Sequence, residues 1–275
     1  MKLITLAIAI AQSSLGFRQE TFGLKSSCPV LEGCTMKKFD TCCVSKMGII
    51  LYSLQWVDAT GPADKFTVHG FWPDRCDGTQ APRSGCDSSR HYHNLVDHLS
   101  SLNSTLVEQM QKNWPSYTGN NPSFWTHEWN KHGTCVSTLE PQCYSEYKKY
   151  EDAHDFFVIV MDLYRKYDYA ASLKKAGIVP GRSYRRDSII KAIQDDTGLH
   201  VALTCRGRNL REVRTWFQAV GRDGLKPIAS QGHSSCPVTI NFQKKAHMRK
   251  LSTPALGKEL VLQNTEAKYS LQTSM

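Results

Sequence analysis

Short apolar and β-branched runs along the chain predict the strands of a sheet. Apolar and β-branched residues dominate Gly48–Val57, which indicates a buried central strand. Alternation through Phe66–Val68 predicts a second strand that Gly70 and Pro73 end, leaving His69 at its mouth. Further strands are predicted at Val201–Cys205, Val213–Val220 and Val238–Phe242.

Apolar residues at helical spacing predict the helices that accompany this sheet. They lie at 91–114, through the stretch 124–135 as far as Gly133, at 144–167, and at 185–196 before Gly198. Helices and strands are interspersed without a regular strand–helix–strand rhythm. The pattern therefore indicates an α+β fold with a mostly antiparallel central sheet flanked by several helices, in a single domain.

The first residues have the layout of a secretory signal peptide. Lys2 precedes an apolar run from Leu3 to Ala11, and small residues follow it. The run is shorter than the ~20 residues of a membrane span, and no later stretch comes closer, so we expect no membrane association. A buried N-terminal strand is the alternative. We expect a signal peptide at 1–16.

Charge and composition indicate a globular protein with an anionic partner. Lys and Arg number 34 against 25 Asp and Glu, a formal net charge of +9, which favours nucleic acid. Hydrophobic residues make up 40% of the chain and charged residues 21%, which excludes global disorder. We expect one domain at 17–243 and a flexible basic extension at 244–275. We hypothesise that the extension adds phosphate contacts through Lys244, Lys245, Arg249 and Lys250.

The densest group of titratable side chains lies in the stretch from Phe124 to Cys135. On a helix at about 100° per residue, one face gathers His127, Glu128, Lys131 and His132. Trp125 and Trp129 would then pack this helix into the core. A solvated helix with a Glu128–Lys131 pair is the simpler interpretation.

A zinc site is the other alternative for this stretch. The zinc-protease pattern places two histidines four residues apart, about 40° around a helix. His127 and His132 are five residues apart, roughly 140° around the helix. We therefore expect no metal at this position.

A second group lies in the stretch from Phe66 to Asp74. Trp72 offers a flat stacking surface and Asp74 a hydrogen-bond acceptor, which together suit an unpaired base. Alone, a histidine, a tryptophan and an aspartate at the end of a strand are more often structural. The presence of both stretches in one chain favours a functional site.

The two stretches resemble the active-site segments of the ribonuclease T2 family of secreted acid ribonucleases. The usual forms are a strand ending His-Gly-Leu-Trp-Pro and a helix reading His-Glu-Trp-x-Lys-His-Gly-Thr-Cys. This chain matches both, with Phe71 in place of leucine. The likeness runs from about Cys28 to Cys236 and is closest to the ten-cysteine extracellular branch.

The resemblance implies an endoribonuclease that cleaves single-stranded RNA without metal or cofactor. Such an enzyme forms a 2′,3′-cyclic phosphate and then a 3′-phosphate. On the family pattern His132 is the general base and His69 the general acid, an order that the sequence alone does not set. His127, Glu128 and Lys131 would bind the phosphate and stabilise its developing charge.

The resemblance also implies the substrate-binding residues, the partners and the location. Trp72 would stack on a base that Asp74 contacts. Gln80 stands where the ten-cysteine branch has a stacking tyrosine, so base preference stays open. We expect a monomer that binds single-stranded RNA but neither membrane nor metal. It would be secreted or delivered to the lumen of an acidic vacuole or lysosome.

The cysteines and one sequon predict covalent modifications. Ten cysteines behind a signal peptide indicate five disulfides, whose pairing the spacing does not decide. The resemblance implies the pairs Cys28–Cys43, Cys34–Cys76, Cys42–Cys143, Cys86–Cys135 and Cys205–Cys236. Asn103 begins an Asn-Ser-Thr sequon, so we expect glycosylation there.

A binding protein without catalytic activity is the functional alternative to an enzyme. A catalytically silent secreted protein could bind RNA or a cell surface through its basic charge and disulfide framework. Family members of that kind typically lack the active-site histidines, which this chain retains.

Overall fold

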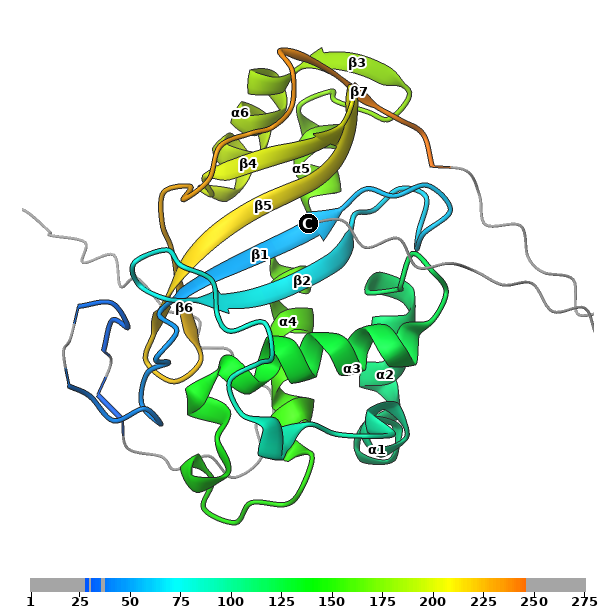
Figure 1. Ribbon diagram of the computed structural model, residues 1–275. Coiled ribbons are helices and arrows are strands. Elements are labelled where there is room, and N and C mark those ends of the chain that lie inside the picture. The colour runs from blue at the N-terminus through cyan, green and yellow to red at the C-terminus, as the bar shows by residue number, and fades with distance from the viewer. Residues whose placement is uncertain (1–27, 30, 36–37, 246–275) are drawn as a thin grey trace, which may run out of the picture.

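One seven-stranded sheet runs through the molecule, and its strand order is β2-β1-β5-β7-β3, with β4 and β6 also paired to β5 (Figure 1). The computed structural model describes residues 28–29, 31–35 and 38–245, so the predicted signal peptide lies outside the described residues. The strands are β1 (Ile49–Gln55), β2 (Thr67–Asp74), β3 (Arg182–Arg185), β4 (Val201–Arg206), β5 (Asn209–Val220), β6 (Gly224–Pro227) and β7 (Thr239–Phe242). β5 and β7 are parallel, and the other strand pairs named here are antiparallel.

The helices lie beside this sheet and together with it confirm the α+β class. They are α1 (Leu95–Leu102), α2 (Ser104–Asn113), α3 (Asn121–Lys131), α4 (Glu151–Lys166), α5 (Tyr169–Lys175) and α6 (Arg186–Thr197). Figure 1 shows α1, α2 and α3 beyond the β2 edge, and α5 and α6 towards the opposite end of the sheet. Within the described ranges, no helix is both long and apolar enough to cross a membrane.

Two predicted helices have different bounds because of local backbone conformation. The helix expected at 91–114 is split into α1 and α2 at Asn103, whose side chain accepts a hydrogen bond from the backbone N–H of Leu106 and caps α2. The helix expected at 144–167 begins only at Glu151, because Tyr150 has a left-handed backbone with φ of 78°. The end of α6 at Gly198, with φ of 72°, confirms the predicted stop.

Asn103 is partly buried. Its Nδ2 lies 3.3 Å from Nε2 of His154, a buried residue of α4. The sequon nitrogen therefore already has a neighbour in the fold, and glycosylation at Asn103 stays a prediction.

The predicted end of the second strand is wrong. β2 continues through Gly70 and Pro73 to Asp74, so His69 lies within the strand. Among the strands of the described residues, β2 lies at the edge of the sheet and has β1 as its one neighbouring strand, and an edge tolerates proline because one side of the strand lacks a continuous ladder of hydrogen bonds. The site is therefore built on a strand interior, where side-chain direction is better defined than in a loop.

Tryptophans pack α3 against the rest of the helical layer, as the helical pattern predicts. Trp114, Trp125 and Trp129 are fully buried, at no more than 1% exposure. The indole of Trp125 donates to the carbonyl oxygen of Trp114, and that of Trp129 donates to the carbonyl oxygen of Arg90, each at 2.7 Å. These hydrogen bonds satisfy the buried ring N–H groups and fix how α3 sits in the core.

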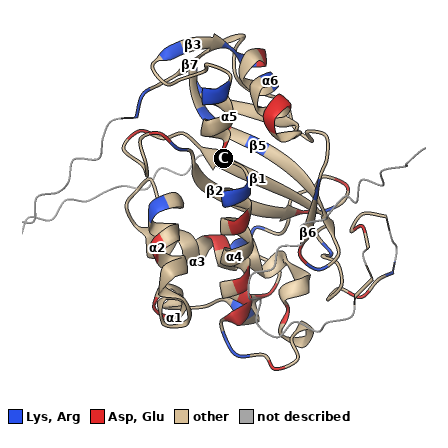
Figure 2. Cartoon of the chain, turned by 180° about the vertical axis from the view of Figure 1, so that it is seen from behind, with Lys and Arg blue, Asp and Glu red and all other residues tan. Residues whose placement is uncertain are grey.

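Acidic side chains follow α4, as Figure 2 shows, and several are buried. Asp152 accepts hydrogen bonds from the Tyr92 hydroxyl, at 2.9 Å to Oδ2, and has the Arg90 guanidinium 3.5 Å away. Asp155 accepts from the Tyr144 hydroxyl at 3.1 Å and contacts Nδ1 of His154 at 3.0 Å. This network compensates the buried charges, so His154 is a structural residue.

Five disulfides join the cysteine pairs that the resemblance implies: Cys28–Cys43, Cys34–Cys76, Cys42–Cys143, Cys86–Cys135 and Cys205–Cys236. Cys76 lies two residues beyond the end of β2, and Cys135 ends the turn that follows α3. Two crosslinks therefore anchor the chain just after both candidate active-site segments.

Lys245 does not fit the hypothesis that it contacts phosphate. Its side chain is buried at 7% exposure, and its ammonium donates to the carbonyl oxygens of Thr60, Pro62 and Lys65 at 3.0, 3.2 and 2.7 Å. The ammonium also lies 4.6 Å from the centroid of the Trp56 ring. Lys245 therefore belongs to the folded domain; Arg249 and Lys250 lie outside the described residues.

Lys245→Met should lower the free energy of unfolding by about 2 kcal/mol or more, because three carbonyls lose a charged donor. Urea denaturation measures the change. Lys244 is exposed, so Lys244→Met is the matched control and should change stability by no more than about 0.5 kcal/mol. Equal losses in the two variants would contradict the assigned role of Lys245.

Candidate active site

A β-bulge sets the position of His69. The register of β1 with β2 steps from Ser53–Gly70 to Leu54–Val68, so His69 is an extra residue without a partner in β1. A bulge bends the strand and re-aims the side chain of the extra residue. The His69 carbonyl accepts a hydrogen bond from the Trp114 indole at 3.1 Å, which ties the bulge to the helical layer.

Trp72 connects β2 with the end of α3. Its ring centroid lies 5.0 Å from that of His69 and 5.6 Å from that of His132. Its Nε1 donates to Oε2 of Glu128 at 3.0 Å. Gly70 is required here, because a Cβ at that position would collide with the Trp72 indole. The rings of the two histidines therefore both contact the Trp72 indole, although the two residues are distant in sequence.

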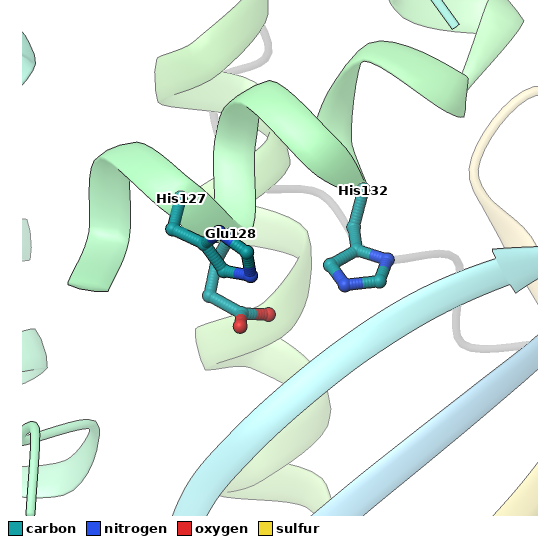
Figure 3. Close-up of side chains that lie close together, drawn as sticks. All are labelled: His127, Glu128 and His132. Carbon is teal, nitrogen blue, oxygen red and sulfur yellow. The ribbon is translucent and has the colours of Figure 1, made fainter. Parts of the chain in front are cut away.

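α3 supplies the other half of the site. Asn120 caps its first turn by accepting from the N–H of Ser123 at 3.0 Å, and the last helical residue is Lys131. His132 lies just beyond, and Figure 3 shows its ring turned toward the side chains of His127 and Glu128.

The predicted polar face of this helix is correct only in part. His127 is exposed, and Lys131 and His132 are partly buried. Glu128 is 3% exposed, and its carboxyl group accepts a hydrogen bond from the Trp72 indole. The alternative of a solvated Glu128–Lys131 pair therefore does not describe this helix.

Burial and neighbouring cations shift the titration of these groups. Burial raises the pKa of Glu128 to about 8, against the opposing effects of the Trp72 hydrogen bond and of Lys131. Burial, with the charges of Lys131, His127 and His69, lowers the pKa of His132 to about 3. Burial and Lys131 also lower the pKa of His127. At mildly acidic pH His132 is therefore neutral and Glu128 protonated.

His127, Glu128 and His132 could together hold a metal ion. Each offers one ligand atom, and these atoms all lie within 4.8 Å of one another. The helical-wheel argument against a metal therefore fails, because His132 lies beyond the last helical residue and its ring turns back toward His127 and Glu128. The absence of a metal stays a prediction.

The residues proposed to contact a base lie at the end of β2. Asp74 is partly buried and accepts a hydrogen bond from the N–H of Ala81 at 3.3 Å. Burial raises the pKa of Asp74, while the Ala81 hydrogen bond and Arg75 oppose the rise. Gln80 forms an isolated β-bridge with Asp74 and is exposed. The departure from a stacking tyrosine thus lies directly beside Asp74.

Glu212 is a site residue that sequence reasoning missed. Its Oε1 lies 2.7 Å from Nδ1 of His69, although the angle is not that of a well-aligned hydrogen bond, so the contact is a close ion pair when the ring is protonated. The predicted strand Val213–Val220 began four residues too late, because β5 begins at Asn209, and so left out Glu212. A charged residue inside a buried strand is the signal that could have identified it.

Comparisons with known proteins agree with this geometry. The model of the Ribonuclease T2 family matches residues 36–236. Ribonuclease Trv of Hypocrea rufa is 40% identical over 215 residues, which cover 75% of this chain and 91% of that protein. Ribonuclease Rh of Rhizopus niveus is 38% identical over 206 residues, 75% of this chain and 87% of that protein.

A solved structure gives the same result at the level of the fold. The crystal structure of Actibind, described as a T2 ribonuclease, superimposes with a TM-score of 0.74 at 35% identity and covers 81% of this chain and 99% of that one. The family model alone spans well over half of the residues. The chain therefore belongs to the Ribonuclease T2 family.

Proposed function

We propose that this endoribonuclease cleaves single-stranded RNA by metal-independent acid–base transphosphorylation between His69 and His132. Family membership makes the chain an RNA-cleaving enzyme, in keeping with the curated ribonucleases at 38–40% identity. Two solved relatives, variants of ribonuclease MC1, are complexes with 5′-GMP and 5′-UMP, at 27% identity and TM-scores of 0.51 and 0.50. Nucleotide binding in relatives supports RNA as the partner.

The observation that carries the proposal is that two imidazoles contact the same indole but have neighbours of opposite charge. His132 lies near the Lys131 cation, and His69 lies beside the Glu212 carboxylate. His132 is neutral over a wide pH range because its pKa is lowered to about 3. Oε1 of the Glu212 carboxylate lies 2.7 Å from Nδ1 of His69, so a negative charge stands beside the ring that would donate the proton. A neutral base and a protonated acid are the pair that cleavage next to a 2′-hydroxyl requires.

The proposed reaction has two halves. The His132 ring takes the proton of the 2′-hydroxyl, and the 2′-oxygen attacks phosphorus. The bond from phosphorus to the 5′-oxygen breaks while the His69 imidazolium gives its proton to that oxygen, leaving a 2′,3′-cyclic phosphate. In the second half His69 takes a proton from a water molecule, and the oxygen of that water attacks the phosphorus of the cyclic phosphate. The bond from phosphorus to the 2′-oxygen breaks, His132 returns its proton to that oxygen, and a 3′-phosphate remains.

Residues of α3 would bind the phosphate during both halves. Lys131 supplies a positive charge, and His127 lies next to His132 at 6.2 Å between ring centroids. Below about pH 8 Glu128 is protonated, so it does not repel the phosphate. As a neutral acid, Glu128 can instead donate a hydrogen bond to a phosphoryl oxygen as charge grows there.

The proposal also includes residues that bind a base, a signal peptide and a glycosylation site. Trp72 and Asp74 would bind a base, with preference left open by Gln80. Residues 1–16 would be a signal peptide that sends the catalytic domain, predicted at 17–243 and extended by the buried Lys245, out of the cell or into an acidic lumen, with Asn103 glycosylated. A titration that keeps His132 neutral at acidic pH supports work in such a compartment.

An activity gel tests the reaction class. The unmodified protein should clear RNA in the presence of a chelator and leave DNA intact, because DNA lacks the 2′-hydroxyl. His69→Ala and His132→Ala should each lower kcat by about 10²- to 10⁴-fold. Loss of clearing with chelator would support a metalloenzyme, and full activity of either variant would refute the acid–base pair.

Lys131→Gln should move the acidic limb of the pH–kcat/KM profile to higher pH. Lys131 disfavours protonation of His132, so its removal lets the base become protonated, and thus inactive, at a higher pH. The measurement is the rate on a dinucleotide across the acidic range. An acidic limb that stays in place would contradict the assignment of His132 as the base.

Glu128→Gln and Glu128→Ala form a matched pair for the role of the buried acid. Glutamine keeps a neutral hydrogen-bond donor, so kcat at acidic pH should fall less than about tenfold, whereas alanine should cost about 10² or more. Equal losses in the two variants would show that Glu128 does not act as a neutral donor.

A further inference from the structure

Glu212 lies in the middle of the sheet, directly behind His69. It stands opposite Gln55 of β1 and Thr204 of β4, and it is 6% exposed. The His69 side chain, at 30% exposure, reaches from the solvent side to within 2.7 Å of it. A carboxylate in this position contacts the imidazole but is screened by it from a bound substrate.

The orientation of the carboxylate is fixed by partners on two strands. Its Oε2 accepts from the Arg214 guanidinium at 2.8 Å from Nε and 2.7 Å from Nη2, and from the Thr204 hydroxyl at 3.2 Å. Oε1 is left for Nδ1 of His69. The two oxygens thus have separate tasks: Oε2 anchors the side chain and Oε1 faces the ring.

The charge of this group persists over the whole acidic range. Burial alone would raise the pKa of Glu212, but the contact with His69, the charge of His69 and that of Arg214 outweigh it and lower the pKa to about 2. The charged groups facing the pair are Arg214 behind the carboxylate and His132 across Trp72. An anion is therefore present whenever His69 changes its protonation.

We propose that Glu212 is a positioning residue, which holds the Nδ1–H of His69 toward the sheet so that Nε2 faces the scissile phosphate. This inference rests on the proposed role of His69 as the acid. When His69 is neutral, this contact keeps the ring proton on Nδ1 and leaves Nε2 without one, because the partner of one ring nitrogen determines which nitrogen is protonated. It also places a negative charge beside the ring that gives its proton to the 5′-oxygen.

The test compares Glu212→Gln with Arg214→Gln. Both variants break the Glu212–Arg214 pair, but only the first removes the charge that faces His69. For Glu212→Gln the alkaline limb of the pH–kcat profile should move to lower pH by about one unit or more. The loss of kcat should be about tenfold at the lowest pH measured and should increase as the pH rises. It should not exceed the 10²- to 10⁴-fold loss expected when the imidazole itself is removed, and KM should change little.

Arg214→Gln is the control for a merely structural role. Its alkaline limb should remain in place or move to higher pH, because the carboxylate near His69 then loses a competing cation. An unmoved limb in Glu212→Gln, or equal losses of rate in both variants at every pH, would overturn the proposal. Thermal unfolding of each variant shows whether the comparison is between folded proteins.

Nitrogen NMR of the unmodified protein keeps the proposal testable if Glu212→Gln does not fold. In neutral His69 the proton should lie on Nδ1, rather than on Nε2 as free histidine prefers. A proton on Nε2 would overturn the role of Glu212 and leave RNA cleavage by the two histidines unaffected. A proton on Nδ1, with an unmoved limb in a folded Glu212→Gln, would refute His69 as the acid.

Discussion

The contact of one indole with two imidazoles and a buried carboxyl group determines the arrangement of this site. Trp72 lies against His69 and His132, and its N–H donates to Glu128. These groups come from an edge strand and from the end of a helix, which local structure alone would not bring together. Burial in this arrangement raises the pKa of Glu128, against the opposing hydrogen bond from Trp72, and lowers the pKa of His132.

The scaffold is built to hold that indole in one place. Gly70 leaves room for the indole, and the bulge at His69 turns the imidazole. Because β2 is an edge strand, it can contain Pro73 immediately after Trp72. Disulfides fix the chain just after β2 and just after α3. Buried tryptophans secure α3 from beneath, so the groups of the site are positioned before any substrate binds.

Much of the fold follows from local patterns, whereas the details that tune the site do not. Periodicity identified β1, β4, β5, β7, α3 and α6, and two short motifs located His69, Trp72, His127, Glu128, Lys131 and His132. The bulge, the 2.7 Å contact of Glu212 with His69 and the capture of Lys245 by three carbonyls depend on pairing between distant segments. The helical wheel misplaced His132 because it assumed a helix extending past Lys131, and it missed the burial of Glu128 because the partner of that carboxyl group, Trp72, comes from a distant strand.

The central claim is that two imidazoles meet one phosphate from opposite sides. A crystal structure with an uncleavable 2′-deoxy dinucleotide tests it most directly. The account predicts a His132 ring nitrogen close to the 2′-carbon and Nε2 of His69 within hydrogen-bond distance, about 3 Å, of the 5′-oxygen. A phosphate bound out of reach of either ring, or one held by His132 alone, would contradict it.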